Sequence, residues 1–296
     1  MMKNVKLSPI LALILVCTLA LSALLASGCG ASSQSSQNGE TTSKSGLKGE
    51  LTISGSTSME EVNNALADAF MAKNPDVKIN VQALGSSQGI QAVSEGSAQI
   101  GASSRALKDD EKTKTPDLKE IAIAMDGIAV VINPANAIAD LKTDDIKKIY
   151  TGEISNWKDL GGSDTPITVV RREDGSGTLD AFSELIMGGK TRDIKYVSSA
   201  VIQNSTGAVM SSVAGDPGAI GFASMGAVDS KLKAVKVDGI AATPGNVLNK
   251  TYRAQRPFVY VTKGDAAGLT KAFIDFALSA EGQKAVSEAK AIPLNK

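Results

Sequence analysis

Three Gly/Ser/Thr-rich turns, each placed after an apolar run, contain the residues best suited to bind an anion. They are Gly55-Ser56-Thr57-Ser58, Gly85-Ser86-Ser87 and Gly175-Ser176-Gly177-Thr178. The first N–H groups of a helix lack partners within the helix, and the aligned peptide dipoles favour a negative charge there. Glycine lets the backbone approach a ligand closely, and hydroxyl groups add further donors. If the three turns meet at one point, they form an oxyanion site of neutral donors.

Helix capping is the alternative explanation for any one of these turns. Ser and Thr are common at helix starts because their side chains accept hydrogen bonds from free backbone N–H groups. Ser58 and Glu61 have the spacing of a capping box. A fourth segment, Asn204-Ser205-Thr206-Gly207, is interpreted as capping only.

The third turn differs from the others because Arg172, Glu173 and Asp174 immediately precede it. A guanidinium group presents a fork of donors that suits a tetrahedral oxyanion. Asp174, two residues after Arg172, is placed to hold that fork and to offset part of its charge. The alternative is a surface Arg/Asp pair at a turn, which is how we interpret Arg171.

The apolar pattern predicts an α/β fold in which these turns connect strands to helices. Short apolar runs alternate with segments that have apolar residues at helical spacing. We predict strands at 51–54, 77–81, 121–133, 167–170 and 258–261, and helical or turn segments at 59–74, 86–93, 144–149, 151–160, 179–186 and 269–289. The long run 121–133 is expected to be buried and to cross between two lobes.

The N-terminus has the pattern of a secretory signal. Lys3 and Lys6 precede an apolar run at 10–25, which is shorter than the roughly 20 residues of a membrane span. Small residues then precede Cys29, so we expect residues 1–28 to be a lipoprotein signal peptide and Cys29 to be lipidated. An ordinary secreted protein is the alternative, because Ala26 stands where leucine is usual. Residues 29–47 are rich in Ser, Gln, Gly and Thr and are expected to be a flexible tether.

Composition excludes several classes of function. The chain has 31 basic and 31 acidic residues, and loss of Lys3 and Lys6 with the signal leaves 29 basic residues and a charge of −2. A slightly acidic, aromatic-poor chain is poorly suited to bind nucleic acid. The chain has no histidine, which removes the usual base of a serine hydrolase. No metal-ligand cluster or P-loop lysine is apparent, so we expect neither an enzyme nor a metal or cofactor.

Six motifs together resemble the substrate-binding protein of bacterial phosphate ABC transporters. They are GSTSMEEV from Gly55, GSSQGI from Gly85, IGASSR from Ile100, IKKIYTGEISNW from Ile146, RREDGSGT from Arg171 and GAIGFAS from Gly218. The resemblance covers the chain after the tether. It implies the two-lobed periplasmic binding protein fold (type II), with a hinged cleft between the lobes. It also implies that residues 48–131 and 256–296 form lobe 1 and residues 132–255 form lobe 2.

The resemblance assigns the phosphate-binding residues to this chain. Ser56, Thr57 and Ser58 match the first contact segment, Ser86 the second and Ser104 the third, whereas the main anion loop is matched by Arg172, Ser176, Gly177 and Thr178, with Asp174 as the partner of the arginine.

One position departs from the pattern. The resemblance implies that some relatives have aspartate at the position of Ser104, where it accepts a hydrogen bond from the ligand's own proton and so rejects sulfate, which has no proton at neutral pH. We expect Asp126, an acid within an apolar run, to supply that acceptor; a hinge carboxylate bound to backbone donors is the alternative. Arg105 is a further candidate for a ligand contact or for a salt bridge across the cleft.

The expected function is capture of inorganic phosphate outside the cell and its delivery to an ABC transporter. A membrane anchor on Cys29, two permease subunits and an ATPase would be the partners. Binding of sulfate or molybdate is the main alternative, hydrolysis of phosphate esters is a weaker one, and an adhesion or signalling role remains open.

Overall fold

The computed structural model describes residues 46–294 of the chain. The predicted signal peptide, Cys29 and all but the last two residues of the predicted tether lie outside the described residues. Among residues 46–294, no helix is long and apolar enough to cross a membrane.

The described residues form one α/β unit, as predicted. The strands are β1 (Gly49–Gly55), β2 (Val77–Ala83), β3 (Ile100–Ser103), β4 (Leu118–Ile132), β5 (Asp140–Leu141), β6 (Thr168–Arg172), β7 (Val201–Gln203), β8 (Ala219–Ser224), β9 (Lys233–Ala234), β10 (Lys236–Val237), β11 (Gln255–Lys263) and β12 (Ile292–Pro293). The helices are α1 (Glu60–Lys73), α2 (Ser86–Glu95), α3 (Asp109–Lys114), α4 (Thr143–Thr151), α5 (Gly177–Phe182), α6 (Thr206–Gly215), α7 (Pro244–Leu248), α8 (Gly268–Leu278) and α9 (Ala280–Glu288).

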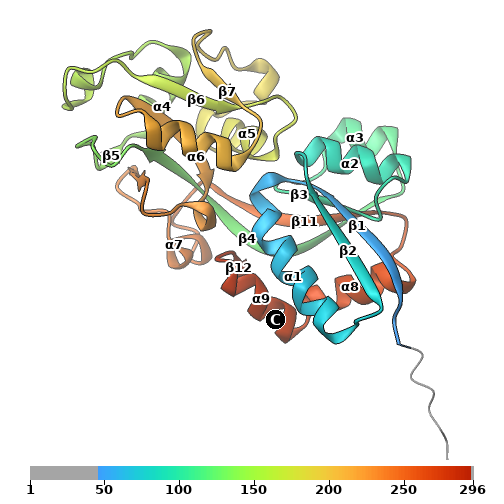
Figure 1. Ribbon diagram of the computed structural model, residues 1–296. Coiled ribbons are helices and arrows are strands. Elements are labelled where there is room, and N and C mark those ends of the chain that lie inside the picture. Colours follow the sequence, from blue (N-terminus) through green and yellow to red (C-terminus); the bar gives the residue numbers. More distant parts are fainter. Residues whose placement is uncertain (1–45, 295–296) are drawn as a thin grey trace, which may run out of the picture. The chain divides into compact units, whose positions relative to one another are not determined.

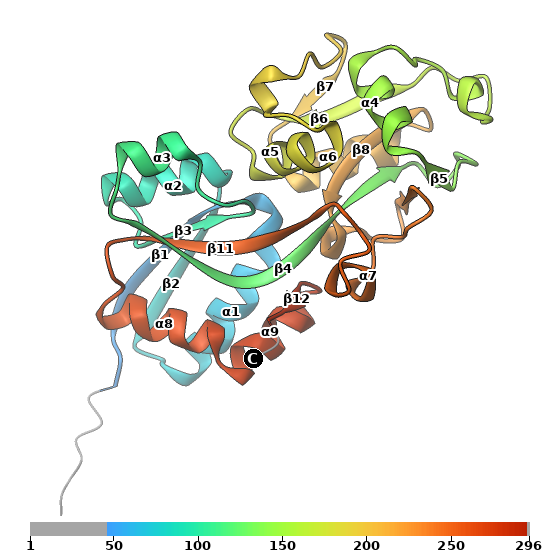
Figure 2. The same ribbon diagram turned by 180° about the vertical axis from the view of Figure 1, so that it is seen from behind.

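A ten-stranded sheet runs through the described residues, with its main path in the order β2-β1-β3-β11-β4-β8-β6-β7. The strands β1, β2 and β3 are parallel, as are β6, β7 and β8. Between these two groups, β11 and β4 are antiparallel and pair from Lys263↔Leu118 to Gln255↔Gly127. Both views show β4 and β11 side by side, with β4 continuing from the group around β1 to the group around β6 (Figures 1 and 2).

The two largest of four hydrophobic clusters among the described residues mark two lobes. The cluster of the first lobe includes Ile53, Phe70, Tyr260 and Phe273, which come from β1, α1, β11 and α8. The cluster of the second lobe includes Tyr150, Trp157, Phe182 and Phe222, with the rings of Phe182 and Phe222 stacked at 4.0 Å between centroids. Burial of such aromatic side chains is a main source of stability in a chain that has no cysteine among its described residues.

The strand β4 contributes side chains to both clusters. Ala124 lies in the first cluster, and Ile128 and Val130 lie in the second. The transition from the first cluster to the second therefore falls around Asp126, in the middle of β4. The predicted lobe boundaries at 131 and 255 stay a prediction.

Most predicted elements are present, and one differs. The predicted closing segment 269–289 is two helices, because Ser279 is extended (φ −73°, ψ 164°) and ends α8. The Ser279 Oγ then accepts a hydrogen bond from the N–H of Gly282 and caps α9.

Candidate anion-binding site

The first lobe places three serines at one edge of its parallel strands. The strands β1, β2 and β3 end in register, since Gly55 pairs with both Ala83 and Ala102, and their carboxyl ends therefore meet. Directly after these strands lie Ser56, Ser86 and Ser104, all at most 5 % exposed. The Ser56 Oγ donates to the Ser104 Oγ at 2.9 Å, and the Ser104 N–H donates to the Ser86 Oγ at 3.2 Å.

The second lobe places two further turns at the ends of β6 and β7. These strands pair in parallel up to Arg172↔Gln203, so the segments after them also meet. The Ser176 Oγ accepts from the N–H of Leu179 and caps α5. The Ser205 Oγ accepts from the N–H of Ala208 and caps α6.

Hydroxyl groups from the two lobes contact one another directly. The Oγ of Ser58 and the Oγ1 of Thr178 are 2.6 Å apart, and the Oγ1 atoms of Thr57 and Thr206 are 3.1 Å apart. Each of these bonds joins the first lobe to the second. We use the name hydroxyl cage for the buried set Ser56, Thr57, Ser58, Ser86, Ser104, Thr178 and Thr206.

Gly177 leaves no room for a side chain between the lobes. A Cβ at this position would lie 2.2 Å from the Ser86 Oγ and 2.7 Å from the Ser104 Oγ. Only glycine fits there while the lobes are in contact. The predicted turns therefore meet at one point, with Ser56, Ser58, Ser86, Ser104, Gly177 and Thr178 brought together as expected from the sequence.

The interpretation of the fourth turn as capping only was wrong. Ser205 does cap α6, but the next residue, Thr206, belongs to the hydroxyl cage. Its Oγ1 is 3.3 Å from the Ser58 Oγ and accepts from Arg172 Nη1 at 3.3 Å. The similarity of the Asn-Ser-Thr-Gly turn to the other three was the signal, because its hydroxyls follow a strand in the same way.

The expected pairing of Arg172 with Asp174 was also wrong. Arg172 is 2 % exposed and donates through Nε and Nη2 to the two carboxylate oxygens of Glu173, both at 2.8 Å. This two-bond geometry is the strongest that an Arg–carboxylate pair has. Asp174 is 85 % exposed and pairs with Arg171 instead. The structure therefore gives Asp174 no contact with the cage, and Glu173 positions Arg172.

Asp126 lies behind the cage and forms a buried ion pair with Arg256. Its Oδ2 accepts from Arg256 Nε at 3.0 Å and lies 2.9 Å from Nη2, and its Oδ1 accepts from the Ser224 Oγ at 2.7 Å. Burial raises the pKa of the Asp126 carboxyl, although the charge of Arg256 and the bond from Ser224 act against it. Asp126 has no direct contact with a cage hydroxyl, since Arg256 links it to Ser58 through an Nη2–Oγ distance of 3.3 Å. Its contacts resemble the hinge alternative, with side chains as the main donors, and its proposed role as proton acceptor stays a prediction.

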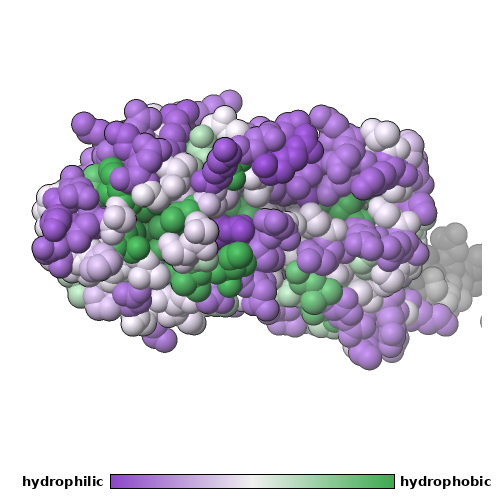
Figure 3. Space-filling view, turned by 90° about the horizontal axis from the view of Figure 1, so that it is seen from above, coloured by the Kyte–Doolittle hydropathy of each residue, from purple (hydrophilic) through white to green (hydrophobic). Residues whose placement is uncertain are grey.

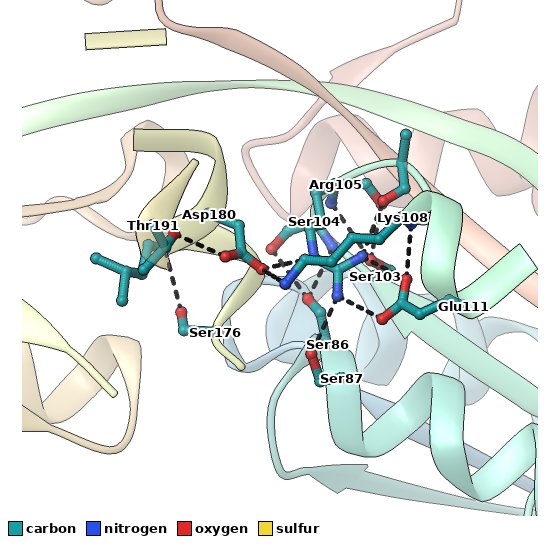
Figure 4. A network of polar contacts seen from close by, with 12 residues as sticks. Ser86, Ser87, Ser103, Ser104, Arg105, Lys108, Glu111, Ser176, Asp180 and Thr191 are labelled. Atoms are coloured by element: carbon teal, nitrogen blue, oxygen red, sulfur yellow. Dashed lines mark hydrogen bonds and ion pairs between the residues drawn. The ribbon is translucent and has the colours of Figure 1, made fainter. Parts of the chain in front are cut away.

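Arg105 forms the salt bridge across the cleft that was one of its two expected roles. Its Nε donates to Asp180 of the second lobe at 2.9 Å, while its other nitrogens donate to Glu111, Ala106 and Ser87 of the first lobe. Burial acts to lower the pKa of Arg105, but Glu111 and Asp180 outweigh it and the pKa is raised. Figure 4 shows Lys108 beside Arg105 and directed to the same carboxylate, 2.7 Å from Asp180.

A cavity of about 1160 Å³ lies next to this salt bridge and outside the cage. It is lined by charged residues of both signs from the two lobes, including Lys108, Asp180 and Lys195. Seen from above, hydrophilic residues cover much of the surface, with several hydrophobic patches among them (Figure 3). None of the cage hydroxyls lines this cavity, and the hydroxyls themselves are buried.

Comparison with known proteins assigns the family. Residues 33–281 match the profile of the PBP superfamily domain. The phosphate-binding protein PstS of Bacillus subtilis is 36 % identical over 277 residues, which are 93 % of this chain and 91 % of that protein. The chain belongs to the PstS family of the PBP superfamily. The PstS of Staphylococcus aureus is 32 % identical over 284 residues, covering 90 % of this chain and 83 % of that protein.

Solved structures of PstS-type proteins have the same fold. A putative phosphate ABC transporter substrate-binding protein from Clostridium perfringens, solved with bound phosphate, is 47 % identical with a TM-score of 0.80. The match covers 83 % of this chain and all of that one. An ABC-type phosphate transport receptor from Vibrio cholerae is 35 % identical with a TM-score of 0.69, over 82 % of this chain and all of that one. The predicted two-lobed α/β fold is therefore confirmed.

Proposed function

We propose that this protein binds inorganic phosphate outside the cytoplasm and delivers it to an ABC transporter. The observation that carries the proposal is the hydroxyl cage with Arg172, which is built from the ends of parallel strands in both lobes. The names of the relatives in Bacillus subtilis and Clostridium perfringens support the same ligand.

The cage suits phosphate because its donors are neutral, buried and able to turn. A hydroxyl that now bonds to another hydroxyl can redirect its proton to a phosphate oxygen without losing a hydrogen bond. Arg172 supplies a fixed positive charge, and the start of α5 supplies backbone N–H groups at Gly177 and Thr178. The proposed contact residues are Ser56, Thr57, Ser58, Ser86, Ser104, Arg172, Ser176, Gly177, Thr178 and, from the structure, Thr206.

Binding of phosphate would also favour closure of the lobes. The proposed ligand groups come from both lobes, so phosphate reaches all of them only when the lobes are together. A ligand shifts a conformational equilibrium by its difference in affinity for the two states. The closed form would then be the signal that a permease reads.

The location and the partners complete the proposal. Cleavage before Cys29 and lipidation of its thiol would hold the protein at the outer face of the membrane, with residues 29–47 as the tether. Two permease subunits and an ATPase would form the transporter. Labelling with radioactive palmitate tests the anchor, because label that persists in the Cys29→Ala variant contradicts it.

Titration calorimetry on the purified, ligand-stripped protein tests the function. We expect tight binding of phosphate, and we expect Arg172→Met to weaken it by at least about 100-fold, since a buried charge-assisted contact is lost. A wild-type protein that does not bind phosphate would overturn the proposal.

A second tetrahedral oxyanion, such as sulfate, is favoured by one observation. Residue 104 is a serine and not a carboxylate, and the oxygens of Asp126 and Glu173 already accept bonds from their own partners. No carboxylate is therefore in position to repel a protonless anion. Titration with sulfate in the same experiment separates the two ligands.

A further inference from the structure

One buried guanidinium nitrogen has no partner. Among the side-chain polar atoms of residues 46–294, Arg256 Nη1 is buried and makes no hydrogen bond, and the Arg256 side chain is only 2 % exposed. Leaving a buried charged donor unsatisfied is expensive, so such a group calls for an explanation. The other two nitrogens are used, since Nε donates to Asp126, and Nη2, which is 2.9 Å from the same carboxylate, donates to the Ser58 Oγ.

The same guanidinium borders the hydroxyl cage. Arg256 Nη2 is 3.3 Å from the Ser58 Oγ, and Ser58 contacts Thr178 and Thr206. Arg172 Nη1 reaches the same Thr206 hydroxyl from the opposite lobe. Burial lowers the pKa of Arg256, and the nearby charge of Arg172 lowers it further. The positive charges of Arg172 and Arg256 therefore both lie at the hydroxyl cage.

Each guanidinium is paired with a carboxylate, and each also reaches a hydroxyl of the cage. Glu173 holds Arg172, and Asp126 holds Arg256. The carboxylates orient the two guanidinium groups and offset their charge. Neither Arg172 Nη1 nor Arg256 Nη1 bonds to a carboxylate. An anion with two negative charges would satisfy both.

We propose that Arg256 is a phosphate-binding residue, which donates through Nη1 to a phosphate oxygen opposite Arg172. The inference rests on the proposed function and deepens it, because it makes the site one of two guanidinium groups instead of one. Asp126 is then a positioning residue, which orients Arg256 between β4 and β11 and does not touch the ligand. This role also explains why a charged pair lies within two buried strands where the lobes join.

A structural brace is the competing explanation, in which Arg256 and Asp126 only tie β4 to β11. The double variant Asp126→Asn/Arg256→Gln distinguishes the two, because it replaces the ion pair by a neutral hydrogen-bonded pair and leaves no unpaired buried charge. As a matched control, Tyr252→Phe removes another buried hydrogen bond of the hinge, the one from Tyr252 Oη to Ile128 O at 2.7 Å.

Phosphate calorimetry and thermal unfolding of the full-length, ligand-stripped protein test the inference. We expect the double variant to fold and to bind phosphate about 100-fold more weakly, whereas Tyr252→Phe lowers the unfolding temperature and changes the affinity less than about threefold. A folded double variant with wild-type affinity would overturn the role of Arg256 while leaving phosphate binding intact. If the wild-type protein does not bind phosphate, the proposed function itself is overturned.

Arg256→Lys keeps the test decisive if the double variant does not fold. The ammonium group retains the charge beside Asp126 but lacks the separate nitrogens with which a guanidinium reaches both Asp126 and the ligand. We expect at least about tenfold weaker phosphate binding, and unchanged affinity refutes the proposal. A crystal structure with phosphate gives a direct check, because Nη1 beyond hydrogen-bond distance of every phosphate oxygen contradicts it.

Discussion

Replacement of Gly177 by alanine gives the sharpest test of the closed cage. The added Cβ would lie 2.2 Å from the Ser86 Oγ and 2.9 Å from the Ser86 Cβ. The Oγ can rotate away, but the Cβ is fixed to the backbone and has to retreat by about 0.5 Å, since real Cβ contacts are rarely below 3.4 Å. This retreat separates the two lobes at the point where the bonds of the cage cross between them, such as the 2.6 Å bond from Ser58 to Thr178.

The strain acts on the closed form and is absent when the lobes are apart. Overpacking of this kind costs about 1–3 kcal/mol, which corresponds to about 5- to 150-fold weaker phosphate binding. Calorimetry measures the affinity, and small-angle scattering with and without phosphate measures closure. The unfolding temperature of the ligand-free protein should stay close to that of the wild type.

Gly207→Ala is the matched control, because Gly207 also lies in the first turn of a helix next to the cage. A Cβ at Gly207 has no atom within 4 Å. If Gly177→Ala binds phosphate as tightly as the wild type, the lobes do not need the contact between Gly177 and Ser86. If both variants lose affinity equally, the effect belongs to helix starts in general and not to closure.

Three further predictions concern the edge and the selectivity of the site. Asp180→Asn removes the negative charge that Arg105 and Lys108 share across the lobes, and we expect about 5- to 30-fold weaker phosphate binding in calorimetry. Unchanged affinity would mean that these salt bridges do not hold the closed form. Thr206→Val removes one hydroxyl of the cage and should weaken phosphate binding about tenfold in the same assay. Unchanged affinity would mean that this turn only caps α6. Ser104→Asp introduces a buried carboxylate that can accept a hydrogen bond from the proton of phosphate, so the preference for phosphate over sulfate should rise at least about tenfold in competition titrations. An unchanged ratio of the two affinities would refute the argument that a carboxylate at this position distinguishes phosphate from sulfate.

The sequence predicted elements well where their apolar period was long. The helix 60–73 and the strand 118–132 follow from residues that repeat over many positions. The four-residue β3 and the three-residue β7 are too short to show a period, although both supply ends from which the cage is built. The break at Ser279 was missed because its neighbours continue the helical pattern on both sides.

The sequence predicted the hydroxyls of the site better than its charges. Hydroxyls at strand ends are positioned by the backbone, which parallel pairing brings to a common edge. The partner of Arg172 depends on the direction of its side chain at the end of β6. The adjacent residue, Glu173, accepts hydrogen bonds from both Nε and Nη2 of Arg172. The pair of Asp126 and Arg256 spans 130 positions and is made by the pairing of β4 with β11, which no local motif encodes.

The charge distribution indicates how a slightly acidic protein can hold an anion. Residues 29–296 have a net charge of −2, so long-range attraction does not bring phosphate to the site. At the cage, Arg172 and Arg256 are each paired with a carboxylate, which keeps the ligand-free cage close to neutral. The remaining nitrogens and the hydroxyls are donors that act only at contact distance. Selectivity would then depend on shape and hydrogen bonding, and release would follow when separation of the lobes removes half of the donors at once.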